Sequence, residues 1–328
     1  FVRAEEIKRL YLKDEPLFLQ EASPENLFYQ LVAGIIASKK MVILSSKLTT
    51  FATQKIKDEA NTLLDLNANS ALFYLLSSGT TGKSKLISLS LQNIYSSATG
   101  VINTFQMQKN DTSFLNLPTH HIGGLMVLWR AFFSSSAITL NENENYQFIS
   151  LVPLQLKRLL DHPEKIASLQ KCRAILIGGA LLSAELKNIA ISQHKLIIYE
   201  TYGMTETCSL VLLNGRPVGE VQVKLSSDSL FLIKGPVLSP DVTVDSEGFY
   251  HTQDQGKINP DGGLQFVSRA DLLFKSAGEL IDPQEIERVA KELCEITEAL
   301  VIPIAHPEWT NATTLLYQSN DLQSSKAD

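Results

Sequence analysis

The sequence predicts an α/β protein of about two domains. The large N-terminal domain has parallel sheets flanked by helices, with a small β-rich subdomain, and a small, incomplete α+β C-terminal domain follows. Two observations carry this prediction. Short apolar runs alternate with helix-spaced apolar residues up to about residue 215, after which apolar runs and turn residues follow one another closely. We place the large domain at residues 1–270, its β-rich subdomain at about 215–270, and the partial C-terminal domain at 271–328, since 328 residues suffice for about two domains.

Seven apolar, β-branched runs in the first part of the chain have the length of buried strands. They cover residues 41–44, 71–76, 113–117, 137–140, 148–152, 174–177 and 196–200. Two of the intervening segments place their apolar residues on one helical face: residues 24–36, behind the N-cap Ser23 and the first-turn proline Pro24, and residues 91–105, behind Ser90. Such alternation favours parallel sheets with helices on both faces.

Closely spaced strands are expected next, at residues 220–225, 230–234 and 264–268, separated by turn residues. A helix is expected within the C-terminal domain. Asp282 is its N-cap, Pro283 its first-turn proline and Glu285 its capping-box glutamate, and a strand at 299–304 follows.

Charge and cysteine content exclude several classes of protein. The net charge is −6 and no cluster of five or more basic residues occurs, which disfavours non-specific binding to nucleic acid or anionic membranes. No apolar run reaches the roughly 18 to 20 residues of a membrane-spanning helix. Cys172, Cys208 and Cys294 are far apart without CxxC spacing, which argues against a disulfide framework and a zinc ribbon. With no secretory leader in view, we expect a cytoplasmic protein without membrane insertion.

The strongest local motif is LSSGTTGKSK at residues 76–85, directly after a predicted strand. Its two glycines allow the backbone to turn and present N–H groups, while its hydroxyls and lysines add hydrogen bonds and positive charge, so the loop can hold phosphate oxygens. The spacing between the glycines is not that of a Walker A loop. A flexible surface loop is the alternative. The candidate ligands are Ser77, Ser78, Gly79, Thr80, Thr81, Gly82, Lys83 and Lys85.

Two further motifs offer nucleotide-binding chemistry. In YETYGMTETCS, residues 199–209, Glu206 is an oxygen ligand suited to Mg²⁺ and Tyr202 offers an aromatic face for a base; the alternative is a helix start capped by Thr205. Asp254 and Arg269 flank a predicted hairpin. The carboxylate can accept both hydroxyls of a ribose and the arginine can add a second contact, whereas a solvated ion pair is the alternative.

The order of these motifs, followed by KSAGELIDPQEIE, resembles the adenylate-forming (AMP-binding) superfamily of acyl-CoA synthetases, adenylation domains and luciferases. The segments at residues 117–132, 150–160, 176–186 and 249–258 look most like the o-succinylbenzoate-CoA ligases of menaquinone biosynthesis. The sequence departs from the family pattern at Ser84, Leu86, Gln253 and Ala277. The chain is also expected to lack the catalytic lysine that family members carry near their C-terminus, because Lys326 does not have its sequence setting.

The resemblance implies a role for individual residues. It implies that Lys85, Thr205, Glu206 and His121 are catalytic, that Glu206 is the Mg²⁺ ligand, and that Asp271 is the hinge between the domains. It implies an acyl site at Arg130, which would recognise a substrate carboxylate, with His121 and Gly179. The implied ATP site contains, besides the phosphate loop, Gly178, Gly179, Ala180, Glu200, Thr201, Tyr202, Gly203, Asp254 and Arg269.

The activity implied by the resemblance is that of an acid-CoA ligase (AMP-forming). It would adenylate a carboxylic acid, with o-succinylbenzoate the leading candidate, and transfer the acyl group to CoA, using ATP and Mg²⁺. Its partners would be the small-molecule acid, ATP and CoA, with a homo-oligomer left open. Two alternatives remain: an adenylation enzyme that loads a carrier protein or makes only the acyl-adenylate, and a non-catalytic, truncated homologue that binds a nucleotide or acyl group.

Overall fold

The computed structural model describes residues 16–63, 71–77, 85–292 and 296–319. The chain divides into two compact units. The first unit comprises Phe1–Lys224, Leu232–His251 and Ile258–Gln265, and the second comprises Leu225–Phe231, Thr252–Lys257 and Phe266–Asp328.

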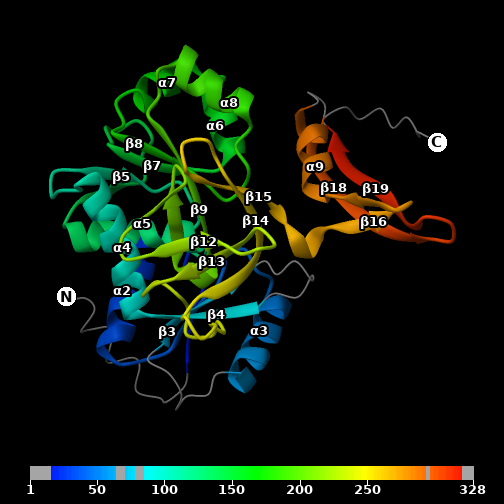
Figure 1. The fold of residues 1–328 in the computed structure, drawn as a ribbon. Helices are drawn as coiled ribbons and strands as arrows, with labels where there is room; N and C mark the ends of the chain where they lie inside the picture. Colours follow the sequence, from blue (N-terminus) through cyan, green and yellow to red (C-terminus); the bar gives the residue numbers. More distant parts are fainter. Residues whose placement is uncertain (1–15, 64–70, 78–84, 293–295, 320–328) are drawn as a thin grey trace. The chain divides into compact units, whose positions relative to one another are not determined.

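The first sheet has four strands in sequence order. The last two, at residues 71–77 and 85–90, are labelled β3 and β4 in Figure 1. The strands are β1 (Leu17–Leu19), β2 (Met41–Ile43), β3 (Ala71–Ser77) and β4 (Lys85–Ser90). The first three are parallel, and β4 returns antiparallel to β3. Because side chains alternate along a strand, Met41, Ile43 and Phe73 pack on one face with helices, while Val42 and Tyr74 pack on the other.

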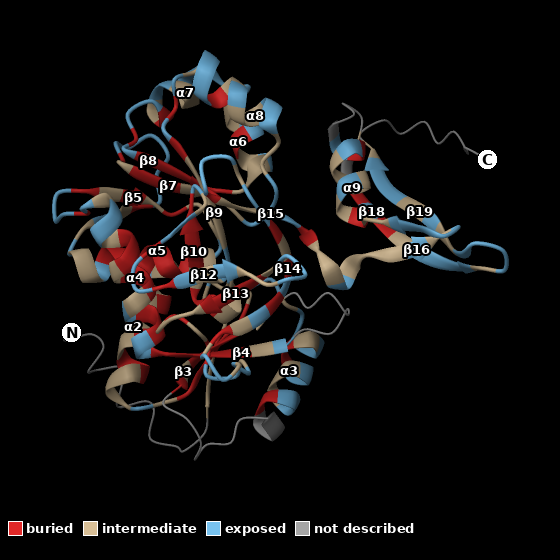
Figure 2. Cartoon of the chain, viewed as in Figure 1, coloured by how far each residue is buried: buried red, intermediate tan, exposed pale blue. Residues whose placement is uncertain are grey.

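Helices cover both faces of this sheet. The helices α2 (Pro24–Ile36), α4 (Leu91–Phe105) and α5 (Ile122–Ser134) share a core with one face, and α3 (Thr50–Leu63) packs on the other. Trp129 of α5 is the largest fully buried side chain of that shared core. Figure 2 shows buried residues concentrated along α4, α5 and the strands. Ser23 caps α2 by accepting a hydrogen bond from the backbone N–H of Asn26, as the sequence predicts.

The second sheet has seven strands in the order β11-β10-β9-β8-β7-β5-β6. The strands are β5 (Thr112–Phe114), β6 (Ala137–Thr139), β7 (Phe148–Leu151), β8 (Ala174–Ile177), β9 (Ile198–Met204), β10 (Ser209–Leu213) and β11 (Arg216–Pro217). The five from β6 to β9 are parallel, so β7, β8 and β9 end at one edge of the sheet. β10 and β11 continue it antiparallel.

Helices also cover the second sheet on both faces. Ile149, Ile175 and Ile177 pack with leucines of the short helices on one side, and Phe148 and Leu176 pack with residues of α4 on the other. The short helices are α6 (Pro153–Leu160), α7 (Pro163–Leu169) and α8 (Ala184–Asn188), the last continued by the π-turn η1 (Ile189–Gln193). The predicted α/β class with parallel sheets is therefore confirmed.

The β-rich region forms a four-stranded sheet in the order β12 (Gln222–Leu225), β13 (Leu230–Lys234), β14 (Tyr250–Ile258) and β15 (Leu264–Arg269). After residue 269 the second unit contains the 3₁₀ turn η3 (Ala270–Leu272) and the helix α9 (Pro283–Glu292). It also contains two antiparallel hairpins. The first is formed by β16 (Phe274–Ser276) and β17 (Glu279–Ile281), and the second by β18 (Ile296–His306) and β19 (Thr310–Ser319). Within the described ranges, no helix is long and apolar enough to cross a membrane.

Candidate functional site

The end of β8 runs close to β9. The hydroxyl of Thr201 donates a hydrogen bond to the carbonyl oxygen of Ile177 at 3.2 Å, and a Cβ atom at Gly178 would lie 2.2 Å from the Thr201 hydroxyl oxygen. Gly179 follows with φ +77°, a conformation that favours glycine. The structure therefore brings Gly178, Gly179 and Thr201 together, and Ala180 next to them is exposed.

Two residues that sequence analysis missed hold Glu200. Asn214 accepts a hydrogen bond from the Glu200 N–H at 2.8 Å and donates its own N–H to the Glu200 carbonyl, also at 2.8 Å. Lys187 of α8 pairs with the Glu200 carboxylate. Asn214 and Gly215, with φ of +47° and +75°, form the turn between β10 and β11. An Asn-Gly pair after an apolar run is a hairpin signal that could have identified this turn.

The segment after β9 places Thr205 and Glu206 in a single 3₁₀ turn, η2 (Thr205–Thr207), with Met204 as its N-cap. The alternative of a helix capped by Thr205 is therefore wrong. Gly203 permits the hairpin with β10, because a Cβ atom there would lie 2.0 Å from the Ser209 carbonyl oxygen. The carboxylate of Glu206 is half-buried and has no hydrogen bond or ion pair with any described residue.

The ends of the predicted phosphate loop lie opposite each other. Ser77 of β3 pairs with Lys85 of β4, and the Ser77 hydroxyl donates a hydrogen bond to the Lys85 carbonyl at 3.3 Å. Lys85 is exposed. The remaining loop residues of the prediction, Ser78, Gly79, Thr80, Thr81, Gly82 and Lys83, lie outside the described residues, as does Lys326.

Arg130 lies inside the first unit, on the inner side of α5. Its side chain is buried, with 6% of the residue exposed, and its Nε donates to the Met126 carbonyl of the preceding turn at 2.9 Å. Burial lowers its pKa to about 10, so the guanidinium is protonated at neutral pH. Among described residues, no carboxylate pairs with it.

Arg130 lines a cavity of about 20 Å³, which is room for roughly one water molecule. Two serines are the other polar residues of its wall, and the remaining residues are apolar. The lining residues are Val101, Phe105, Met107, Ser113, Phe114, Val127, Arg130, Phe148, Ile149, Ser150 and Leu176. The cavity therefore places a cation in a nearly dry apolar setting.

His121 is the N-cap residue of α5, nine residues before Arg130. Its ring lies beside that of His120, with ring centroids 4.3 Å apart. Desolvation lowers the pKa of His121; it also lowers that of His120, where His121 and Lys47 add repulsion. The helix begins tightly against the preceding loop, because a Cβ atom at Gly124 would lie 2.3 Å from the Pro118 carbonyl oxygen.

The second unit brings Asp254, Arg269 and Asp271 together. Arg269 forms two hydrogen bonds with Asp271, from Nε at 2.9 Å and from Nη2 at 3.0 Å, and its Nη1 lies 3.6 Å from the Asp254 Oδ1. Asp254 is buried, with 5% exposed, so this is not a fully solvated ion pair. The sequence predicted a role for each residue but not the contact between Arg269 and Asp271.

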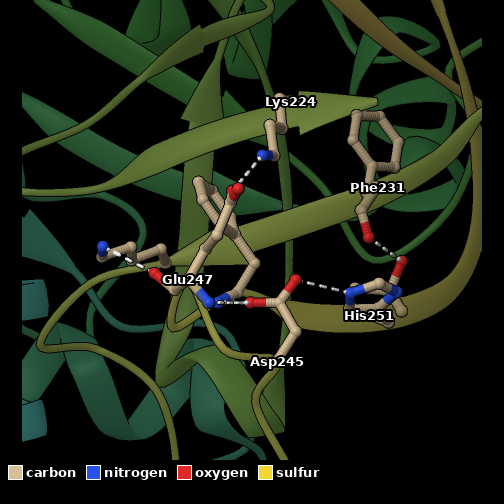
Figure 3. A network of polar contacts seen from close by, with 8 residues as sticks. Lys224, Phe231, Asp245, Glu247 and His251 are labelled. Atoms are coloured by element: carbon tan, nitrogen blue, oxygen red, sulfur yellow. Dashed lines mark hydrogen bonds and ion pairs between the residues drawn. The ribbon is translucent and has the colours of Figure 1, made fainter. Parts of the chain in front are cut away.

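A polar network of the first unit, also missed from the sequence, fixes the turn before β14 (Figure 3). Asp245 accepts hydrogen bonds from the N–H groups of Glu247 and Phe249 at 2.9 Å and pairs with His251 at 2.8 Å. Glu247 in turn pairs with Lys224 at 2.9 Å. The hydrogen bond with His251, followed by the one from the Phe249 backbone, lowers the pKa of Asp245.

Metal-ligating side chains do not cluster in the described part of the chain: no group of three or more His, Cys, Asp or Glu is close enough to hold an ion. A Mg²⁺ ion is commonly held by one or two carboxylates plus the phosphates of a substrate. The Glu206 carboxylate, which has no partner among the described residues, fits that mode of binding.

Comparison with known proteins gives concordant results. Residues 20–229 match the model of the AMP-binding enzyme family. The 2-succinylbenzoate–CoA ligase of Haemophilus influenzae is 30% identical over 275 residues, which cover 77% of this chain and 60% of the relative. The 2-succinylbenzoate–CoA ligase of Staphylococcus aureus strain MSSA476 is 33% identical over 299 residues, which cover 79% of this chain and 59% of the relative. The chain thus spans about 60% of the length of these relatives.

Solved structures share the fold. The o-succinylbenzoate CoA synthetase of Bacillus subtilis, in complex with the acyl-adenylate OSB-AMP, superimposes with a TM-score of 0.80 at 20% identity, covering 98% of this chain and 82% of that one. MatB from Rhodopseudomonas palustris, bound to ATP, has a TM-score of 0.81 at 17% identity, covering 99% and 83%. The family match extends over more than half of the sequence and includes β8, β9 and η2. The chain belongs to the AMP-binding enzyme family.

Proposed function

We propose that this protein is an ATP-dependent acid-CoA ligase that acts on o-succinylbenzoate or a closely related aromatic dicarboxylate. One observation carries the choice of substrate: the protonated Arg130 lies in an apolar cavity without a carboxylate partner in the described part of the chain. The names of the 2-succinylbenzoate–CoA ligases to which the chain is similar support the same choice.

Burial of Arg130 has an energetic consequence. A desolvated cation without a counter-ion is destabilising, and an anion that binds there regains the lost interaction. A charge-assisted hydrogen bond contributes about 1.5 to 3 kcal/mol, and a guanidinium can offer two to one carboxylate. The cavity admits only a group the size of one water, so neighbouring side chains must move for a whole aromatic acid to bind.

The ATP-binding residues of this proposal are those that the family resemblance implies. The loop between Ser77 and Lys85 holds the phosphates, the segments 178–180 and 200–203 bind the adenine, and Asp254 with Arg269 binds the ribose. Glu206 and Thr205 would hold Mg²⁺, which would neutralise phosphate charge when bound. In this proposal residues 271–328 form part of a lid domain that turns about Asp271.

The reaction has two steps and needs no nucleophile from the protein. The substrate carboxylate oxygen attacks the α-phosphorus of ATP, and pyrophosphate leaves with the electron pair of the broken bond. The thiolate of CoA then attacks the acyl carbonyl, and AMP leaves. In this proposal Lys85 supplies positive charge to the phosphates during the first step, and His121 acts near the acyl site, as the family resemblance implies.

The proposal is tested by thioester formation with o-succinylbenzoate, benzoate and a fatty acid as parallel substrates. Arg130→Ala is expected to raise the KM for o-succinylbenzoate by roughly 10- to 100-fold, because one to two charge-assisted hydrogen bonds are lost, and to leave the KM for benzoate nearly unchanged. Arg130→Lys keeps the charge but not the planar guanidinium, so its KM for o-succinylbenzoate should lie between those of the wild type and Arg130→Ala.

Other outcomes separate the alternatives. An equal effect of Arg130→Ala on all three acids would remove the carboxylate-recognition role. Pyrophosphate exchange without a thioester would favour an enzyme that makes only the adenylate or loads a carrier protein. Nucleotide binding without exchange would favour a non-catalytic binding protein.

A further inference from the structure

Asn93, in the first turn of α4, has every side-chain polar atom in a hydrogen bond although the residue is only 7% exposed. Its Oδ1 accepts from the Ser90 N–H at 2.8 Å and from the Ser90 hydroxyl at 2.9 Å. Its Nδ2 donates to the carbonyls of Pro236 at 2.7 Å and Leu238 at 2.9 Å. One amide therefore completes the cap of α4 and holds a segment about 145 residues away.

The segment held by Asn93 contacts the backbone of Glu206. Ser239, which is buried, donates its N–H to the Glu206 carbonyl at 2.8 Å. Asp241 accepts from the Ser88 N–H of β4 at 2.8 Å, which ties the same segment to the strand that begins with Lys85. Residues 236–241, the clamp segment, thus connect β4, α4 and η2.

A second bond from α4 reaches the other side of η2. Ser97, one turn after Asn93, donates its hydroxyl to the Cys208 carbonyl at 2.6 Å. The carbonyls on either side of Thr207 are therefore both held, that of Cys208 directly by α4 and that of Glu206 through the clamp segment. Since the Glu206 carboxylate has no partner of its own among described residues, these two backbone bonds are the contacts that fix where its side chain starts.

We propose that Asn93 is a positioning residue for Glu206, acting through the Ser239 N–H. This inference rests on the proposed function, which gives Glu206 its role toward Mg-ATP. Loss of the two Nδ2 donors leaves two partly buried carbonyls without a partner, so the clamp segment moves and releases Glu206.

The test separates the clamp from the helix cap. Asn93→Asp keeps the acceptor that caps α4 but puts an acceptor where both donors were. Asn93→Ser removes both amide donors without adding charge, together with the Oδ1 acceptor of the cap, and serves if the aspartate variant does not fold. Ser90→Ala is the matched control, because it removes the capping hydroxyl and leaves both Asn93 donors in place.

Two measurements report on each variant. Hydrogen exchange of the peptides covering residues 236–241 and 204–208 should accelerate about tenfold or more in Asn93→Asp and Asn93→Ser, in line with the loss of one to two hydrogen bonds. The KM for Mg-ATP should rise about tenfold while the KM for the acid changes less than twofold. Ser90→Ala should leave both peptides and both KM values near those of the wild type.

Uniformly faster exchange throughout the chain, or equal effects in Ser90→Ala, would overturn the positioning role. The exchange measurement does not depend on turnover. If the wild type makes no adenylate, the proposed function fails, and exchange at residues 204–208 still decides whether Asn93 holds Glu206.

Discussion

Arg130 and Arg269 occupy opposite environments in this chain. Arg130 is buried on α5 and lines an apolar cavity, and among the described residues its side chain is bonded only to a carbonyl of its own helix. Arg269 keeps 32% of its side chain exposed and lies against two carboxylates, Asp254 and Asp271. A cation already neutralised by the protein holds the protein's own groups in place, whereas a desolvated cation without a counter-ion is free to bind an external anion.

The largest expected effect on stability comes from the paired arginine. Arg269→Met removes the cation 3.6 Å from the buried Asp254 carboxylate and both bonds to Asp271, so we expect a loss of about 2 kcal/mol in the free energy of unfolding. Urea denaturation measures this. Arg158→Met is the control, because Arg158 is exposed and its side chain forms no interaction with the described residues. If both variants lost the same free energy of unfolding, the contacts of Arg269 with the two carboxylates would not stabilise the fold more than an exposed arginine does.

A smaller effect of opposite sign is expected for the unpaired arginine. Arg130→Met replaces a desolvated charge by an apolar side chain of similar length, so the free energy of unfolding should stay the same or rise by about 1 kcal/mol. The same urea series measures it. A loss of 2 kcal/mol or more would show that Arg130 stabilises the fold and would weaken its assignment as an anion site.

The smallest expected effect is a change of the free energy of unfolding with pH, caused by His121 at the start of α5. Because folding lowers the pKa of His121, the unfolded chain binds a proton first as the pH falls below about 6.5, and stability decreases from there toward the folded pKa. His121→Gln should flatten the decrease between pH 7 and 5, as followed by thermal unfolding. If the stability of His121→Gln depended on pH as steeply as that of the wild type, the desolvation of the His121 ring would be contradicted.

Features that depend only on neighbouring residues, such as the starts of helices, could be predicted from the sequence. Ser23 with Pro24 begins α2, and Ser90 begins α4, where the sequence places them. β4 was missed because its residues 85–90 continue the glycine-rich loop without a boundary that periodicity can detect. The second function of Asn93 was missed because its partners lie in a loop more than 140 residues away. The contact of Arg269 with Asp271 was missed because nothing in the sequence shows how a side chain turns back along its own chain.

The close approach of β8 and β9 at Gly178 affects how variation among relatives should be interpreted. A side chain larger than hydrogen meets the Thr201 hydroxyl there, and at Gly203 it meets the backbone of β10. In a library that randomised both positions, selection for folding would remove the substitutions before selection for turnover could act. Glycine retained at these positions during evolution would therefore record the packing of the strands, whether or not a nucleotide contacts them.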